Sequence, residues 1–185
     1  LAAAAGSMSW RRALVAALAA AFISGLGGLA ACNSDPPSSY LAEVGCTSGA
    51  TRDPNESEGP EMTPGRACNT CHAEDNAASG EGDAPIFAFA GTVFPGGHEP
   101  DDCIASGSQG AQVIVTDAMG KEFTAAVNAV GNFLFEDEHF AYPYKAKVVF
   151  MGRERRMQTA QQSGDCNSCH TAAGDLGAPG RIVLP

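Results

Sequence analysis

The chain of 185 residues is strongly acidic: 11 Lys and Arg stand against 21 Asp and Glu, which gives a formal net charge of −10. Such a chain repels the phosphates of nucleic acids, so the composition argues against nucleic-acid binding and favours partners with a basic face. The functional prediction rests on the seven cysteines and four histidines.

The chain opens with the pattern of an export signal. Residues 1–7 look like upstream sequence, Met8-Ser9-Trp10-Arg11-Arg12 is a short basic region, and residues 13–31 are uncharged and rich in Ala, Leu and Gly. Leu29-Ala30-Ala31-Cys32 resembles the lipobox of bacterial lipoproteins, in which the signal is cleaved before a cysteine that is then acylated. We therefore expect residues 1–31 to be removed and Cys32 to anchor the exported protein to the bacterial outer membrane.

A retained transmembrane helix is the alternative to cleavage, because the apolar run is just long enough to span a bilayer. Three glycines weaken a helix in this run: Gly25, Gly27 and Gly28. Cleavage would remove only two charged residues, Arg11 and Arg12, and would leave a net charge of −12. The mature chain is therefore expected to be even more acidic than the full one.

Two loop-rich segments follow the signal. Residues 32–45 include the Pro- and Ser-rich stretch 33–39 and predict a flexible tether between the lipid and the folded part. Residues 46–85 predict an N-terminal arm that is extended as far as a short helix over 73–79, which Gly80 ends.

Two copies of one cysteine motif organise the chain: Cys68-Asn69-Thr70-Cys71-His72 and Cys166-Asn167-Ser168-Cys169-His170. Each reads C-x-x-C-H, the attachment signature of c-type haem. The two thiols can each add to one vinyl group of the same porphyrin, and the adjacent His then binds the iron as its proximal ligand. The sequence therefore predicts two covalently attached haem c groups, one at each motif.

Zinc binding and thiol redox chemistry are the alternatives for these cysteines. A four-thiolate zinc ribbon spaces its two C-x-x-C pairs about 15–20 residues apart, much closer than here. A thioredoxin-like pair requires a βαβ context, which neither motif has. Both alternatives therefore rank well below haem attachment.

Cys46 and Cys103 remain once the lipid and the two haems are assigned. In an oxidising compartment outside the cytoplasm, a leftover pair of cysteines predicts a disulfide. Two free buried thiols are the alternative.

The distal ligands of the irons are sought among the remaining histidines, His98 and His139. His98 lies in a Gly- and Pro-rich loop near Cys103, and His139 lies among acidic residues, where a solvated or salt-bridged side chain is the alternative. Two spare histidines for two irons predict bis-His ligation. The competing ligands are methionines: Met62, Met119, Met151 and Met157.

Short strands between regularly spaced turns occupy residues 86–160. β-branched and aromatic residues there alternate with polar or small ones, and glycine turns separate the runs. The expected strands are 86–94, 112–116, 123–127, 133–135 and 144–150, with a last one over 181–184. They predict a mainly β fold: a small antiparallel β-sandwich over 86–160, flanked by two loop-rich haem c binding segments over 46–85 and 161–185.

The order of turns within the sandwich resembles a known family. Gly91-Thr92-Val93, Gly110-Ala111-Gln112-Val113, the turn over 117–120 and Gly131-Asn132-Phe133 are similar to the carboxypeptidase-regulatory or transthyretin-like sandwich. The resemblance covers residues 87–157 and implies a structural or adhesive module without catalytic activity. A haem motif on each side departs from that family and suggests a scaffold that positions two cofactors.

Together these features predict an exported dihaem c-type cytochrome lipoprotein that transfers electrons to redox partner proteins and is not an enzyme. The sequence contains no Walker loop, nucleophile elbow or H-E-x-x-H motif. A dihaem peroxidase-like enzyme is one alternative, although the chain is short for it. A surface binding or structural module with redox-sensing haems is another, and a homo-oligomer or a polymer with stacked haems is compatible with either role.

Overall fold

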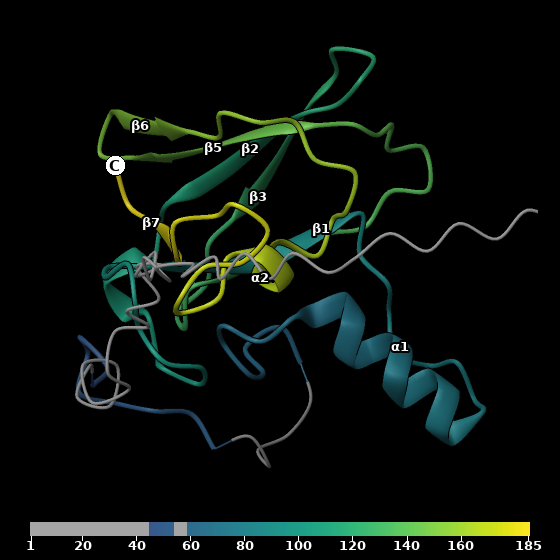
Figure 1. Ribbon diagram of the computed structural model, residues 1–185, viewed down its shortest axis with the longest axis horizontal. Coiled ribbons are helices and arrows are strands. Elements are labelled where there is room, and N and C mark those ends of the chain that lie inside the picture. Colours follow the sequence, from purple (N-terminus) through teal and green to yellow (C-terminus); the bar gives the residue numbers. More distant parts are fainter. Residues whose placement is uncertain (1–44, 54–58) are drawn as a thin grey trace, which may run out of the picture. The chain divides into compact units, whose positions relative to one another are not determined.

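The computed structural model describes residues 45–53 and 59–185, so the expectations for the export signal, for Cys32 and for the tether up to residue 44 lie outside the described residues. In the described part, seven strands form two sheets (Figure 1). The larger sheet has the order β3 (Glu122–Ala126), β2 (Gln112–Thr116), β5 (Lys145–Phe150), β6 (Arg153–Arg156), and the smaller has the order β4 (Asn132–Phe135), β1 (Phe89–Phe94), β7 (Ile182–Val183).

The mainly β class predicted from the sequence is confirmed. Neighbouring strands are antiparallel, as expected, except that β7 pairs with β1 in parallel through Val93 and Ile182. The helical elements are α1 (Cys68–Ser79), α2 (Cys166–Cys169) and a short 3-10 turn, η2 (Ser106–Ser108).

Alternating apolar residues place one face of the larger sheet in the core. In β2, Val113 and Val115 are buried while their neighbours are half-buried or exposed, and Phe123 and Ala125 repeat this pattern in β3. Val113 lies opposite both Ala125 and Val148, so apolar side chains meet across three strands. Aromatic rings complete the core: Phe89, Phe133, Phe140 and Tyr144.

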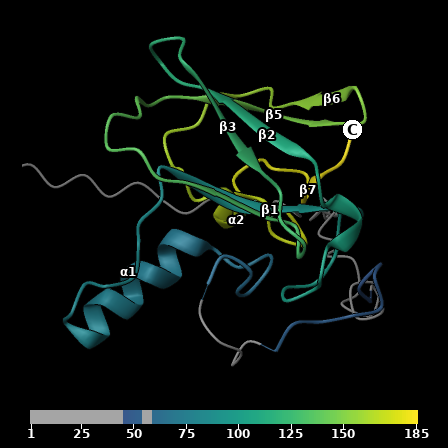
Figure 2. The same ribbon diagram turned by 180° about the vertical axis from the view of Figure 1, so that it is seen from behind.

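β1 is buried along its whole length because it is covered on both faces. Phe89 and Val93 belong to the core between the sheets, whereas Thr92 is bonded to residues of the two motif segments. In Figures 1 and 2, both α1 and α2 lie on the side of β1 away from the four-stranded sheet. The helices that carry the two cysteine motifs therefore lie on the same side of β1.

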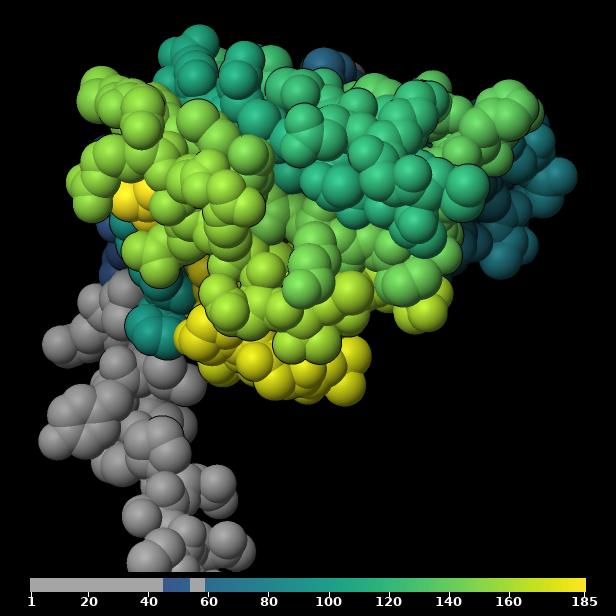
Figure 3. All heavy atoms as spheres, turned by 90° about the horizontal axis from the view of Figure 1, so that it is seen from above, coloured from purple at the N-terminus to yellow at the C-terminus, as the bar shows by residue number. Residues whose placement is uncertain are grey.

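The outer face of the four-stranded sheet lies toward the viewer in Figure 3, and its edge strand is rich in arginine. Strand β6 has the sequence Arg-Glu-Arg-Arg, is exposed at every position and pairs with β5 along the sheet edge. Arg156 lies opposite Lys147 of β5, and both side chains pair with Glu154. Arg153 and Arg155 lie opposite Phe150 and Val148, on the other face of the sheet. The basic residues of β5 and β6 thus belong to the sheet that lies farther from the cysteine motifs.

The structure corrects the expected extended conformation of the first motif. Helix α1 begins at Cys68, five residues earlier than expected, so Cys68, Cys71 and His72 are helical. The expected end is confirmed, because Gly80 adopts the left-handed conformation (φ 73°) that glycine allows at a helix C-terminus.

Neither helix of the described residues has the length and hydropathy required to cross a membrane.

Candidate functional site

The first motif occupies the first turns of α1. Cys71 and His72 follow Cys68 by three and four positions, so all three side chains project from one side of the helix. His72 is 9% exposed, packs against the ring of Phe87, and has its Nδ1 2.5 Å from the carbonyl oxygen of Pro85. The loop after α1 therefore fixes the orientation of this imidazole.

The second motif occupies α2 and the residue that ends it. His170 follows the helix, and its Nδ1 lies 2.8 Å from the carbonyl oxygen of Gly180. Cys169 is half-buried, whereas Cys166 is buried beneath the hydroxyl of Tyr144, with an Oη–Sγ distance of 3.6 Å. The two cysteines of this motif thus differ strongly in accessibility.

The asparagine of each motif attaches that motif to β1 or to the residues just before it. The side-chain amide of Asn69 donates to the carbonyl of Phe87 and accepts from its N–H, at 2.9 and 2.8 Å. The Oδ1 of Asn167 accepts from the N–H of Thr92 at 3.0 Å, and its Nδ2 lies 3.1 Å from the Thr92 hydroxyl. The asparagine at the second position of each motif therefore has the same role in both: it fixes the motif to a neighbouring segment through hydrogen bonds to its main chain.

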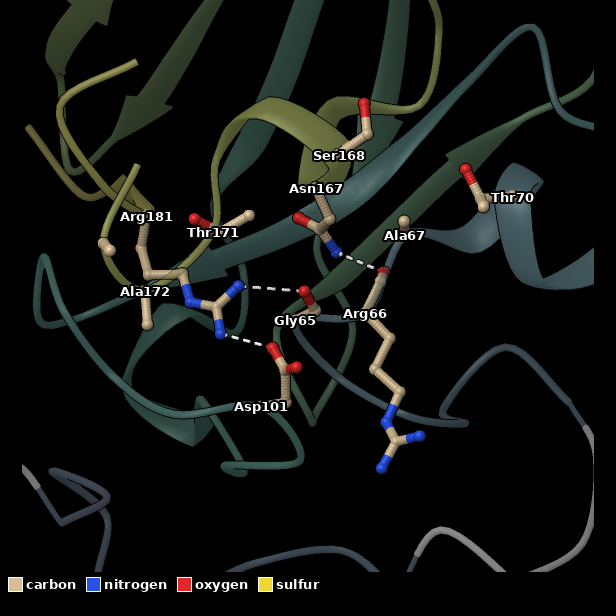
Figure 4. Close-up of a pocket in the computed structure, with 11 residues that line it drawn as sticks. Gly65, Arg66, Ala67, Thr70, Asp101, Asn167, Ser168, Thr171, Ala172 and Arg181 are labelled. Carbon is tan, nitrogen blue, oxygen red and sulfur yellow. Dashed lines mark hydrogen bonds and ion pairs between the residues drawn. The ribbon is translucent and has the colours of Figure 1, made fainter. Parts of the chain in front are cut away.

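The two motifs are also joined directly. The N–H and the hydroxyl of Thr70 donate to Oδ2 of Asp165 at 2.9 and 2.8 Å. The Nδ2 of Asn167 donates to the carbonyl of Arg66, two residues before the first motif, as Figure 4 shows. Residues about 100 positions apart in the chain thus form one site.

Arg181 connects the motifs to the loop of His98. Its buried guanidinium donates to the carbonyls of Gly65, Glu99 and His170 and forms an ion pair with Asp101 (Figure 4). Arg181 also lines a cavity of about 540 Å³ between residues 65–70 and 167–173. The cysteines and histidines of the two motifs are not among the residues that line this cavity.

The loop of His98 is held by several independent contacts. Cys46 and Cys103, the pair expected from cysteine counting, form a disulfide. The buried carboxylate of Glu99 accepts from the N–H groups of Gly96 and Thr47, at 2.9 and 3.1 Å. His98 itself is exposed, and its Nδ1 lies 2.7 Å from the carbonyl oxygen of Ala172.

His139 has different surroundings. Its side chain is 90% exposed, and its Nδ1 lies 3.5 Å from the carboxylate of Asp137. The N–H of His139 also donates to Asp137, which lowers the pKa of that carboxyl group. Of the competing methionines, Met119 and Met151 are exposed, and Met157 packs against the core.

The carbonyl contacts indicate which ring nitrogen carries a proton in three imidazoles. A carbonyl oxygen only accepts hydrogen bonds, so the Nδ1 atoms of His72, His98 and His170 must carry the proton. Their Nε2 atoms then hold the free lone pair that binds a metal, an arrangement typical of metal-ligating histidines. In the neutral form, both histidines of the motifs and His98 would therefore present Nε2 as the metal-binding atom.

All four motif thiols are free. Burial raises the pKa of Cys68 to about 12 and that of Cys166 to about 11, and the charge of Asp165 contributes to both shifts. Among the described residues, no three His, Cys, Asp or Glu side chains are grouped as a bare metal ion would need.

In the first motif, the exposed Cys71 and the carbonyl contact of His72 fit haem c, whereas Cys68 is half-buried and His72 is buried against Phe87, so haem attachment requires local opening here. In the second motif, His170 is oriented by a carbonyl in the same way, and Cys169 is half-buried. A thioether at Cys166 requires the covering Tyr144 to be displaced, or requires attachment before the sandwich closes over the thiol.

Sequence reasoning did not identify the residues that assemble the site: Asn69, Glu99, Asp165, Asn167 and Arg181. The one available signal was the repeated asparagine within the two motifs. Apart from the bond of Arg181 to His170, the side-chain contacts of Asp165 and Arg181 join segments 80 or more residues apart, which no local pattern can reveal.

Comparison of the chain with models of protein families, with curated proteins and with solved structures found no match.

Proposed function

We propose that this protein is a dihaem c-type cytochrome that transfers single electrons at the surface of a bacterial membrane. The observation that carries the proposal is that both histidines of the C-x-x-C-H motifs donate Nδ1–H to a backbone carbonyl, which leaves Nε2 free for iron. Bound haem supplies the one-electron chemistry, as its iron alternates between Fe(II) and Fe(III).

One haem would be held by Cys68, Cys71 and His72, and the other by Cys166, Cys169 and His170. His98 would be a distal ligand, supported by its tautomer and by the rigid loop that presents it. His139 is the candidate for the second distal position, and its exposure leaves the imidazole accessible. The chain's own contribution is to orient these imidazoles and to set the electrostatic environment of the irons.

Charge distribution supports a partner with a basic docking face. Helix α1 and the loop after it carry exposed acids and no Lys or Arg: Glu74, Asp75, Glu81 and Asp83. The cations of β5 and β6 lie on the opposite layer of the sandwich. A basic partner would therefore approach from the side of the motifs, and this attraction would weaken as salt is added.

The sandwich would serve as a rigid scaffold in the manner of the carboxypeptidase-regulatory or transthyretin-like domains it resembles. Export and lipidation at Cys32 would place it on the outer membrane. Replacement of Cys32 by Ser should yield a soluble or uncleaved protein, and a cleaved variant that still fractionates with membranes would refute the anchor.

An optical redox titration under CO tests electron transfer against peroxidase-like chemistry. An electron carrier with both axial positions filled should be reduced reversibly and should bind little CO. A peroxidase must keep one iron open, so stoichiometric CO binding at one haem of the unmodified protein, together with peroxide turnover, would overturn the proposal.

A further inference from the structure

Helix α1 lacks an N-cap of its own. Ala67 occupies the N-cap position and has no side-chain acceptor, although the first N–H groups of any helix need one. Asp165 supplies it from 95 residues away, because its Oδ2 accepts the N–H of Thr70, the third residue of the helix. The hydroxyl of Thr70 adds a second bond to the same oxygen.

Asp165 is itself the N-cap residue of α2, yet its side chain makes no hydrogen bond to that helix. Asp165 contacts α2 through its main chain instead, as the Ser168 hydroxyl donates to the carbonyl of Asp165 at 2.6 Å. The carboxylate of the residue that precedes the second motif's helix therefore caps the helix of the first motif.

The carboxylate of Asp165 is buried close to both motifs. The residue is 5% exposed, and its Oδ1 has no hydrogen-bond partner in the described part of the chain. Its Oδ2 is bonded to Thr70, between the two cysteines of the first motif, and the residue directly precedes Cys166 of the second, so its charge lies beside an attachment position of each motif. In agreement, this charge contributes to the raised pKa values of Cys68 and Cys166. Water and salt screen the field of a buried negative charge only weakly.

We propose that Asp165 is a positioning residue shared by the two haem sites, which caps the first motif's helix from the second motif and lowers the reduction potential of both irons. The inference rests on the proposed haem attachment. The potential falls because a nearby negative charge stabilises Fe(III) relative to Fe(II). Capping and charge are separable, since an asparagine side chain can still accept from Thr70 but carries no charge.

The test compares Asp165→Asn and Asp165→Ala with a matched control, Asp117→Asn. Asp117 is also buried and accepts two backbone N–H groups, from Met119 and Lys121, but it lies in the turn between β2 and β3. Asp165→Asn should raise both midpoint potentials, each by about 59 mV, which corresponds to a tenfold change in the redox equilibrium. Asp117→Asn should leave both unchanged.

Hydrogen exchange of the α1 amides provides a readout that needs no haem. In Asp165→Ala these amides should exchange faster than in the unmodified chain, and in Asp165→Asn they should stay protected. Unchanged exchange in Asp165→Ala would overturn the capping role, and a potential shift at one haem or at neither in Asp165→Asn would overturn the shared electrostatic role. A purified protein without two haems would instead refute the proposed function. Hydrogen exchange of the α1 amides would still show whether Asp165 caps the helix.

Discussion

His98 is fastened to the second motif's segment: its Nδ1 lies 2.7 Å from the carbonyl oxygen of Ala172, 74 residues further along the chain. The neighbouring Glu99 is buried and holds the same loop to Thr47, beside the disulfide of Cys46. Ordering a free loop costs about 1–2 kcal/mol per residue. These contacts remove much of that cost before any metal binds, so His98 is a preorganised ligand.

Replacement of His98 by Ala should leave both haems covalently attached and should open one iron. The loop would keep its other contacts, so the main loss is the imidazole itself. CO binding to the reduced protein should appear at one of the two haems, with a shifted potential for that haem. Unchanged CO binding and two unchanged potentials would show that His98 is an ordinary loop residue.

His139→Ala is the companion variant, because both histidines are candidates and only His98 faces a carbonyl. If His139 binds the other iron, its loss should open that iron, and the double variant should bind CO at both. CO binding that responds only to His98 would leave the second distal position to a methionine, which would raise that haem's potential relative to bis-His ligation.

Arg181→Met should destabilise the protein far more than Arg66→Met, although each arginine pairs with a neighbouring aspartate. Arg181 is buried and its loss leaves three backbone carbonyls without their donor, at a cost of roughly 3 kcal/mol. The ion pair of Arg66 with Asp102 is largely exposed and should contribute under about 1 kcal/mol. Urea unfolding of the two variants measures the difference, and equal losses would contradict the assignment of Arg181 as the connecting residue.

Most strands of the sandwich were predictable because each has a recognisable pattern in its own local sequence. Alternation in β2 and β3 and glycine at the turns identify both the strands and their buried faces. Strand β6 escaped prediction because all four of its residues are charged and exposed, so it exists only through pairing with β5. The parallel pairing of β7 with β1 depends on the path of the whole chain and has no local signature.

The candidate site was predictable in its chemistry and not in its assembly. The C-x-x-C-H spacing names the haem-binding residues directly, because the chemistry requires them to be neighbours. The start of α1 at Cys68 was missed because its cap is Asp165, a residue of the other motif. Local sequence around Ala67 contains no capping residue, so the helix appeared to begin later.

Replacement of both Cys46 and Cys103 by Ala should lower the free energy of unfolding by about 4 kcal/mol in the chain-entropy model, since the disulfide spans 57 residues. The double variant avoids leaving an unpaired thiol. Denaturant unfolding with and without reductant gives the value: reductant should destabilise the unmodified protein and leave the variant unaffected. Equal unfolding of both proteins under oxidising conditions would show that the bond contributes nothing.

Thiol alkylation of the haem-free folded chain at pH 8 should proceed in a fixed order. The thiolate is the reactive form, and burial raises the pKa of Cys166 to about 11 and that of Cys68 to about 12, so both react slowly. The exposed Cys71 should react first. All four should react alike in urea, and fast labelling of Cys166 in the folded state would contradict its burial beneath Tyr144.

The central claim is that two haems are attached to this chain, and the intact mass of the mature protein extracted from membranes tests it most directly. The account predicts a mass that exceeds the lipidated polypeptide by two haem groups, with each group mapped by proteolysis to a peptide containing Cys68 and Cys71 or Cys166 and Cys169. A mass without haem, with zinc, or with disulfides within the two motifs would contradict the account.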